Sequence, residues 1–252
     1  MRQKFNLNLQ DLSRLAVLIY GAYGAGKTFL AGDFLKWASE KGPVHFINVK
    51  GEDGYMSLSS IGLGEVGETV ENMGDFNAAI DECAKDKVVG LAIDTLPAVS
   101  NLVIRSLTGG ELRYPDPKID GERAKMMWGQ IKLQTMAAVQ RTRSAVPYVL
   151  WLSAYDKGED ANSGAVRVGP DLIGKQAGAS AAWFDMVGQM RAQTVGVGKV
   201  KRWLQFAPDE SMVVRQRLTN VITKDIILPE GGGGWATFFS VVEGAMKTKG
   251  SV

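Results

Sequence analysis

The chain has 252 residues, of which 45% are hydrophobic and 22% are charged, and its formal net charge is +2. This length suits one large domain or two small ones, and the ordinary composition excludes wholesale disorder. The mildly basic balance permits nucleic-acid binding but does not by itself indicate it. One cysteine and one histidine exclude an intramolecular disulfide and leave a zinc site poorly supplied.

The apolar runs of the sequence are short. The first residues lack the apolar stretch of a secretory signal, and no run is long enough to span a bilayer. We therefore expect a cytoplasmic protein with no membrane partner. Glycine is in excess, at 30 of the 252 residues, whereas an average protein contains about 7%.

Short apolar runs alternate with longer helical patterns in the first two thirds of the chain. The predicted strands are Leu15–Tyr20, Val44–Val49, Val88–Ile93 and Tyr148–Ser153. The predicted helices are Thr28–Gly42, Asn77–Lys85 and Arg123–Arg143. Strands that are apolar on both faces and separated by helices indicate a mainly parallel sheet covered on both sides. The fold class is therefore three-layer α/β.

The pattern changes after about residue 155. Asp156–Ser180 is polar, contains glycine and is weakly periodic, which predicts a long mobile loop. Three strands are predicted next, over Trp183–Met190, Val200–Phe206 and Met212–Leu218, the last two joined by a turn at Pro208-Asp209. A closing helix over Trp235–Met246 follows four glycines. We expect a single domain over residues 1–252, with an N-terminal arm at 1–12 and a tail at 247–252.

A glycine-rich octet follows the first predicted strand. Gly21-Ala22-Tyr23-Gly24-Ala25-Gly26-Lys27-Thr28 fits the pattern G-x-x-x-x-G-K-[ST] at every position. Small residues let backbone N–H groups curl around a phosphate, and the following helix points its positive end at it. Lys27 can reach the β- and γ-phosphates, and the Thr28 hydroxyl can ligate Mg²⁺. The octet therefore predicts a nucleotide-binding site, against the alternative of a chance glycine-rich turn.

Two further strand ends supply acidic residues. Asp94 ends the run Val88–Ile93, where a second magnesium anchor is needed, although an aspartate in this position can also be an ordinary turn residue. Hydrolysis also needs a carboxylate that orients the attacking water. Glu52 is our candidate, with Asp53 as the second choice and a solvated acidic turn as the structural alternative.

Beyond these motifs, the chain resembles the RecA-type recombinase core, particularly the small RecA-like ATPases of bacteriophages that act as single-strand annealing proteins. The resemblance covers most of residues 12–245. It also rests on four later segments. Gly121–Met127 is similar to the family's first DNA-binding loop, and Val213–Arg217 is similar to its basic-x-basic strand. Gly169–Lys175 is similar to the G-P-x-L-x-G-K pattern of the phage group, and Trp183–Val187 to its Asp-x-Val pattern.

The resemblance implies a three-layer RecA-like P-loop NTPase with a C-terminal β-hairpin extension. It implies an ATPase that uses ATP and Mg²⁺, assembles with itself as a ring or filament, and binds single-stranded DNA for phage-type recombination by annealing or strand exchange. If the protein is phage-encoded, it acts in the host cytoplasm. A single-strand-binding protein is a further partner that the resemblance leaves open.

The two arginines of the basic-x-basic strand have a physical interpretation as well. Arg215 and Arg217 lie two residues apart, so on a strand they share a face, where two cations repel unless an anion lies between them. A solvated basic edge strand is the structural alternative. With the resemblance, the pair is expected to act in trans on the γ-phosphate of a neighbouring subunit. The candidate catalytic residues are thus Lys27, Glu52, Arg215 and Arg217.

The candidate DNA-binding residues come mainly from the resemblance. They are Arg113, which precedes Tyr114, and Arg123, Lys125, Arg167 and Lys175, which lie with Lys157 in two loop regions. Basic residues next to aromatic ones, at Arg113-Tyr114 and in Lys199–Trp203, fit a single-strand track, although scattered loop cations usually serve solvation.

Two departures from the family pattern concern hydrolysis. RecA-like proteins have a glutamate directly after the second strand, where this chain has Lys50. They also often carry a polar sensor residue in the strand that corresponds to Tyr148–Ser153; here Ser153 is polar, but the next residue is Ala154. We therefore expect slow hydrolysis relative to ATP binding. The alternatives are a hexameric helicase or helicase loader, and a nucleotide-gated assembly protein without catalysis.

Overall fold

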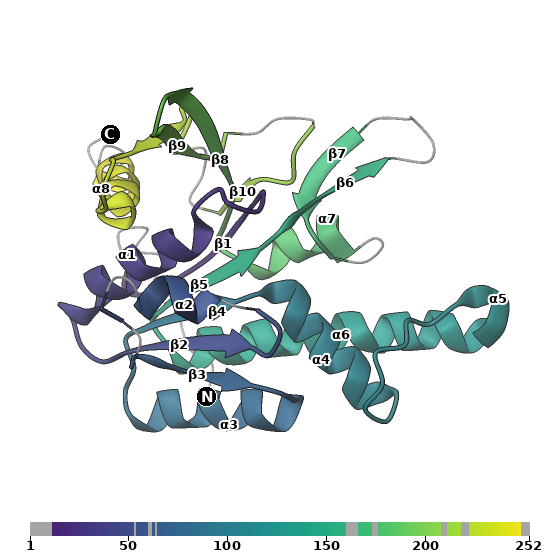
Figure 1. The fold of residues 1–252 in the computed structure, drawn as a ribbon. Helices are drawn as coiled ribbons and strands as arrows, with labels where there is room; N and C mark the ends of the chain where they lie inside the picture. The colour runs from purple at the N-terminus through teal and green to yellow at the C-terminus, as the bar shows by residue number, and fades with distance from the viewer. Residues whose placement is uncertain are drawn as a thin grey trace.

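Figure 1 shows the fold as a computed structural model, which describes residues 12–52, 54–59, 62–63, 65–159, 166–172, 176–207, 211–217 and 222–247. Its strands are β1 (Leu15–Gly21), β2 (Val44–Val49), β3 (Gly67–Val70), β4 (Gly90–Asp94), β5 (Tyr148–Ser153), β6 (Tyr155–Glu159), β7 (Val166–Pro170), β8 (Met186–Gly196), β9 (Lys199–Gln205), β10 (Arg215–Gln216) and β11 (Ile226–Leu228). Its helices are α1 (Lys27–Ser39), α2 (Gly54–Ser59), α3 (Met73–Lys85), α4 (Leu96–Leu107), α5 (Pro117–Asp120), α6 (Glu122–Ala145), α7 (Gln176–Ser180), the short 3₁₀ helix η1 (Ala181–Trp183) and α8 (Gly234–Lys247).

Within the described residues, nine strands form one sheet in the order β11-β9-β8-β1-β5-β4-β2-β3, with β10 paired to β8. The strands from β8 to β3 run parallel, whereas β9, β10 and β11 are antiparallel to their neighbours. This arrangement confirms the predicted fold class: a mainly parallel sheet with a C-terminal hairpin, formed by β8 and β9.

Side chains that alternate along β1 fill the two layers on either side of the sheet. Val17 and Ile19 pack in the core that α1 and α8 cover, whereas Leu18 and Tyr20 pack in the core beneath α3, α4 and α6 (Figure 1). All four are fully buried. Burying such a side chain contributes about 1.5–3 kcal/mol, so the two cores fix the height and direction of β1, whose end carries the glycine-rich octet.

Helix starts were the less accurate part of the prediction. The helix predicted from Asn77 begins at Met73, because the side chain of Asn72 caps it by accepting a hydrogen bond from the Asp75 backbone at 3.0 Å. Helix α4 was missed altogether. Its signal was Thr95, which caps the helix by accepting from Ala98 N, together with a proline in the first turn.

The prediction of a loop over Asp156–Ser180 was wrong for much of that segment. β6 and β7 pair antiparallel as a separate two-stranded sheet, from Tyr155 opposite Pro170 to Glu159 opposite Val166, and α7 follows. Among its described side chains, Tyr155 and Val168 pack against the main core. β6 reads Tyr-Asp-Lys-Gly-Glu, in which a single apolar residue precedes polar ones and a glycine, so its sequence carries little of the alternation that identifies a strand.

The last predicted strands also differ in detail. The strand expected from Trp183 begins at Met186 and runs to Gly196, and the one expected over Met212–Leu218 is reduced to the two residues of β10, which pair with β8. The predicted turn at Pro208-Asp209 lies outside the described residues, as do the arm at 1–11 and the end of the tail. The closing helix is confirmed as α8.

Residues 108–127, together with the neighbouring ends of α4 and α6, extend sideways from the sheet as a helical arm, and the β6–β7 hairpin projects above it (Figure 1). In the described part of the chain, no helix is both long and apolar enough to cross a membrane.

Candidate nucleotide site

The glycine-rich octet joins the end of β1 to the first turn of α1, as its sequence predicts. Gly24 and Gly26 have φ values of 76° and 99°, a left-handed conformation that favours glycine. Gly26 is also the residue before the helix, so the positive end of α1 faces the loop. We call residues 21–28 the phosphate loop.

Lys27 folds back over this loop. Its Nζ atom donates hydrogen bonds to the carbonyl oxygens of Gly21 at 2.9 Å and Ala22 at 3.0 Å, and lies 5.6 Å from the centre of the Tyr23 ring. Burial lowers the pKa of Lys27, and the nearby Asp94 and Glu52 carboxylates act in the opposite direction. From this position Nζ can exchange the two carbonyl oxygens for phosphate oxygens.

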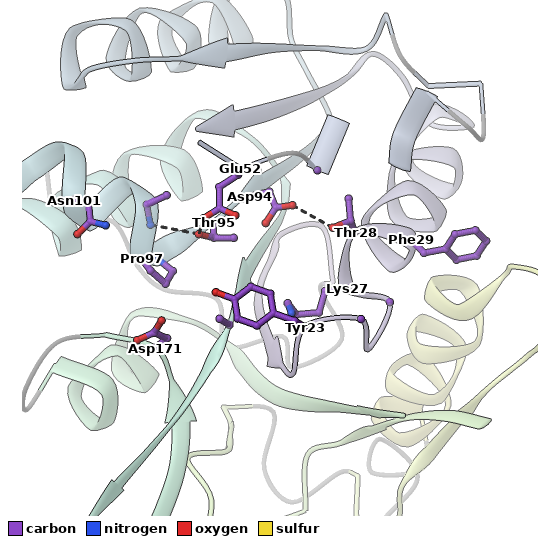
Figure 2. Close-up of a pocket in the computed structure, with 15 residues that line it drawn as sticks. Tyr23, Lys27, Thr28, Phe29, Glu52, Asp94, Thr95, Pro97, Asn101 and Asp171 are labelled. Carbon is purple, nitrogen blue, oxygen red and sulfur yellow. Dashed lines mark hydrogen bonds between the residues drawn. The ribbon is translucent and has the colours of Figure 1, made fainter. Parts of the chain in front are cut away.

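Asp94 lies at the end of β4, and the Thr28 hydroxyl donates to its Oδ2 atom at 3.2 Å (Figure 2). Burial and the neighbouring Glu52 raise the pKa of Asp94 to about 6, while the Thr28 hydrogen bond and Lys27 partly offset them. A Cβ atom on Gly54 would lie 2.3 Å from Asp94 Oδ2, so this approach leaves no room for a side chain. The two predicted magnesium ligands are thus brought together.

Glu52 reaches the same opening from the turn after β2. The Thr95 hydroxyl donates to its Oε1 atom at 3.1 Å, which orients the carboxylate toward Asp94 (Figure 2). Lys50, which takes the family's glutamate position, points away and pairs with Glu71 at 2.8 Å in an exposed ion pair. The structure therefore places the predicted carboxylate in the pocket, and its catalytic role stays a prediction. Asp53 lies outside the described residues.

These side chains line an open pocket of about 630 Å³. Its far wall holds two residues that the motifs did not single out, Asn101 from α4 and Asp171 from the end of β7. Tyr114 in the helical arm donates to Asn101 Oδ1 at 3.1 Å, and burial and Asp156 raise the pKa of Asp171. Pro97, one helical turn before Asn101 on α4, lines the pocket as well, but no motif in the sequence had marked either residue.

The end of β5 contributes no polar side chain to this wall. Ser153 is fully buried and its hydroxyl donates to the backbone oxygen of Ala154 at 2.8 Å, whereas Ala154 itself lines the pocket. This geometry agrees with the departure from the family pattern at Ser153 and Ala154, because the end of β5 places the methyl group of Ala154 in the pocket.

Arg215 and Arg217 do not line the phosphate pocket of their own chain. Arg217 donates to the Ala182 carbonyl at 2.6 Å, and its Nη1 atom lies 3.8 Å from Asp185 Oδ1, near the start of β1. Within the chain, Arg217 therefore lies near Asp185, which pairs more closely with Arg143 at 2.6 Å. Action on a neighbouring subunit stays a prediction.

Those candidate DNA-binding residues that the structure describes lie on the two projecting elements. On the helical arm, Arg113 pairs with Asp120 and Lys125 with Glu122, both at 2.7 Å, and Arg123 lines a cavity of about 390 Å³ together with Arg113. Arg167 lies on β7, and Lys175 falls outside the described residues. Two of these cations are therefore partly neutralised within the arm.

The raised pKa of Asp94 predicts a stability effect. Between about pH 4 and pH 6 the folded protein holds a proton that the unfolded chain releases, so stability falls as the pH rises through this window. Asp94→Asn removes that loss, and its amide oxygen still accepts from Thr28. In nucleotide-free protein with a chelator, we expect the variant to be more stable than the wild type by about 3 kcal/mol at pH 7 and by little at pH 4, measured by urea unfolding. Equal stability at pH 7 would contradict this origin of the shift.

Comparison with known proteins agrees with this geometry. No curated protein sequence matches the chain significantly. Among solved structures, a KaiC-like protein from the hyperthermophilic archaeon Pyrococcus horikoshii OT3 is similar over 87% of each chain, with 16% identity and a TM-score of 0.50, which shows a shared fold. A family model described as an AAA domain matches residues 13–218. The chain is a P-loop protein of RecA-like fold and belongs to this AAA-domain family.

Proposed function

We propose that the protein binds ATP with Mg²⁺ in the pocket at the phosphate loop and hydrolyses it. One observation carries this proposal: Lys27, Thr28, Asp94 and Glu52, which come from three separate segments, line one pocket. The pocket supplies a cation for phosphate, two oxygen ligands for a metal and a carboxylate for water.

The residues present fit this ligand. Magnesium prefers oxygen atoms and takes one or two protein ligands besides phosphates and water, which suits the hydroxyl of Thr28 beside the carboxylate of Asp94. The two would hold Mg²⁺, which when bound neutralises charge on the phosphates. The loop's backbone N–H groups and the positive end of α1 would hold the phosphate chain, and Lys27 would turn from its carbonyl oxygens onto the outer phosphates.

Glu52 is the residue that we assign to the attacking water. Its carboxylate is fixed by the Thr95 hydroxyl and would accept a hydrogen bond from water, which orients the oxygen toward the γ-phosphorus. The alanine at the end of β5 leaves the opposite side of the site without a polar group from that strand. Hydrolysis is therefore slow relative to binding.

Glu52→Gln tests this assignment. The amide keeps the size of the side chain but is a poor proton acceptor, so we expect ATP turnover to fall about 100-fold or more while ATP affinity changes less than about threefold. The measurement is phosphate release together with calorimetric binding. Lys50→Gln is the matched control, since Lys50 lies in the same turn but points away to Glu71, and its turnover should equal the wild type. Undiminished turnover in Glu52→Gln would overturn the role.

We further propose that the ATPase assembles as a ring or filament and binds single-stranded DNA for recombination, by annealing or strand exchange. The family resemblance supports this, together with the place of the β6–β7 hairpin. Ala154 before β6 and Asp171 after β7 both line the pocket, and the Asp171 backbone donates to Ala154 O at 2.9 Å. A bound nucleotide would thus contact the base of the element that carries Arg167, and Arg215 and Arg217 would act on the next subunit's nucleotide.

DNA binding is tested by fluorescence anisotropy of a labelled poly-dT oligonucleotide, with and without Mg²⁺ and ATP, at two salt concentrations. We expect binding that ATP strengthens and that salt weakens steeply, because phosphate contacts release counterions. Binding in no nucleotide state would contradict the DNA function and favour the nucleotide-gated assembly protein. ATP-driven displacement of a paired strand would instead favour a helicase.

A further inference from the structure

Arg202 lies on β9, in a segment whose basic and aromatic residues suggested a DNA track. Side chains alternate along a strand, so Arg202 shares a face with Leu204, which is fully buried in the core that α1 and α8 cover. Lys201 falls on the other face and is exposed. The alternation therefore turns Arg202 toward α1 and the phosphate loop rather than toward solvent.

The arginine makes direct contact with that loop. Its Nε atom donates a hydrogen bond to the carbonyl oxygen of Ala25 at 3.1 Å. A Cβ atom on Gly26 would lie 2.9 Å from the same Nε and 3.2 Å from Cδ of Arg202. The side chain thus packs against the Ala25–Gly26 turn, at the point where Gly26 also needs its left-handed φ of 99°.

The carbonyl groups of the phosphate loop explain why this contact matters. The N–H groups of such a loop face the phosphate, so its carbonyl oxygens need partners on the other side. Those of Gly21 and Ala22 accept from Lys27, and that of Gly26 accepts from Leu30 N at 3.0 Å inside the helix. Lys27 gives up its two carbonyl oxygens when it turns to phosphate, whereas Arg202 does not have to move.

We propose that Arg202 is a positioning residue, which holds the Ala25–Gly26 turn in the shape that binds the phosphates of a nucleoside di- or triphosphate. The inference rests on the proposed function, because it names a residue of the same site. It acts through the loop and not on the reacting atoms. Its loss should therefore weaken ATP and ADP binding equally and leave turnover at saturating ATP unchanged.

Two variants separate the hydrogen bond from the charge. Arg202→Met keeps the bulk and loses both, whereas Arg202→Gln has an amide nitrogen as many bonds from the backbone as Nε and keeps a donor. We expect Arg202→Met to raise the calorimetric Kd for Mg·ATP and Mg·ADP about tenfold, as for one lost hydrogen bond of a charged group, and Arg202→Gln to stay within about threefold of wild type. Lys201→Met, next along β9 on the exposed face, is the matched control and should change neither Kd.

Hydrogen exchange of residues 22–27 in nucleotide-free protein gives a second measurement. We expect faster exchange there in Arg202→Met and wild-type exchange in Arg202→Gln. Wild-type Kd values in Arg202→Met, with or without a lower Tm, would overturn the inference and leave a packing role. Equal weakening in both variants would also overturn it, because charge alone would then be responsible. If the wild type binds neither nucleotide, the proposed function is wrong. In that case the role of Arg202 is still tested by hydrogen exchange: unchanged exchange of residues 22–27 in Arg202→Met would reject it.

Discussion

The buried carboxylate of Asp94 is the constraint on which the rest of the site depends. A charged group with little water around it is costly, and Glu52 nearby adds repulsion, which together raise the pKa of Asp94. The Thr28 hydroxyl and Lys27 offset only part of this. A divalent cation would remove the penalty, because it prefers the charged form of the carboxylate. The nucleotide-free fold thus holds an arrangement that is unfavourable for stability and favourable for binding a metal with phosphates.

The topology of the sheet brings the participants together. β1, β5, β4 and β2 are consecutive neighbours and run parallel, so their carboxyl ends share one edge. Ligand sites in open parallel sheets lie at such an edge. β1 and β4 are separated by one strand, a span of about 10 Å, which Thr28 and Asp94 close with one hydrogen bond. The hairpin of β8 and β9 then supports the phosphate loop from the other side of β1, through Arg202.

The sequence was sufficient where the chemistry is local. The octet at 21–28 has a fixed spacing and sits between a strand and a helix, and Asp94 ends an apolar run, so the places of both could be predicted, whereas their roles toward nucleotide and metal stay predictions. Asn101 and Arg202 could not, because each reaches the loop or the pocket through strand order and helix direction rather than through a motif. The β6–β7 hairpin was missed for a related reason: backbone pairing defines it, and the polar sequence of β6 shows little apolar alternation. Arg217 shows the limit of a motif, since within the chain it lies 3.8 Å from Asp185, whose closer partner is Arg143 at 2.6 Å.

Calorimetric titration of the protein with Mg·ATP tests the central claim most directly, when Lys27→Ala is measured beside the wild type. The account predicts one nucleotide per chain in the wild type and about 100-fold weaker binding in Lys27→Ala, because the variant loses a charged hydrogen-bond donor to phosphate. Lys36→Ala, an exposed position on the same helix, should bind as the wild type does. Wild-type affinity in Lys27→Ala, or no binding by the wild type, would contradict the assignment of the pocket.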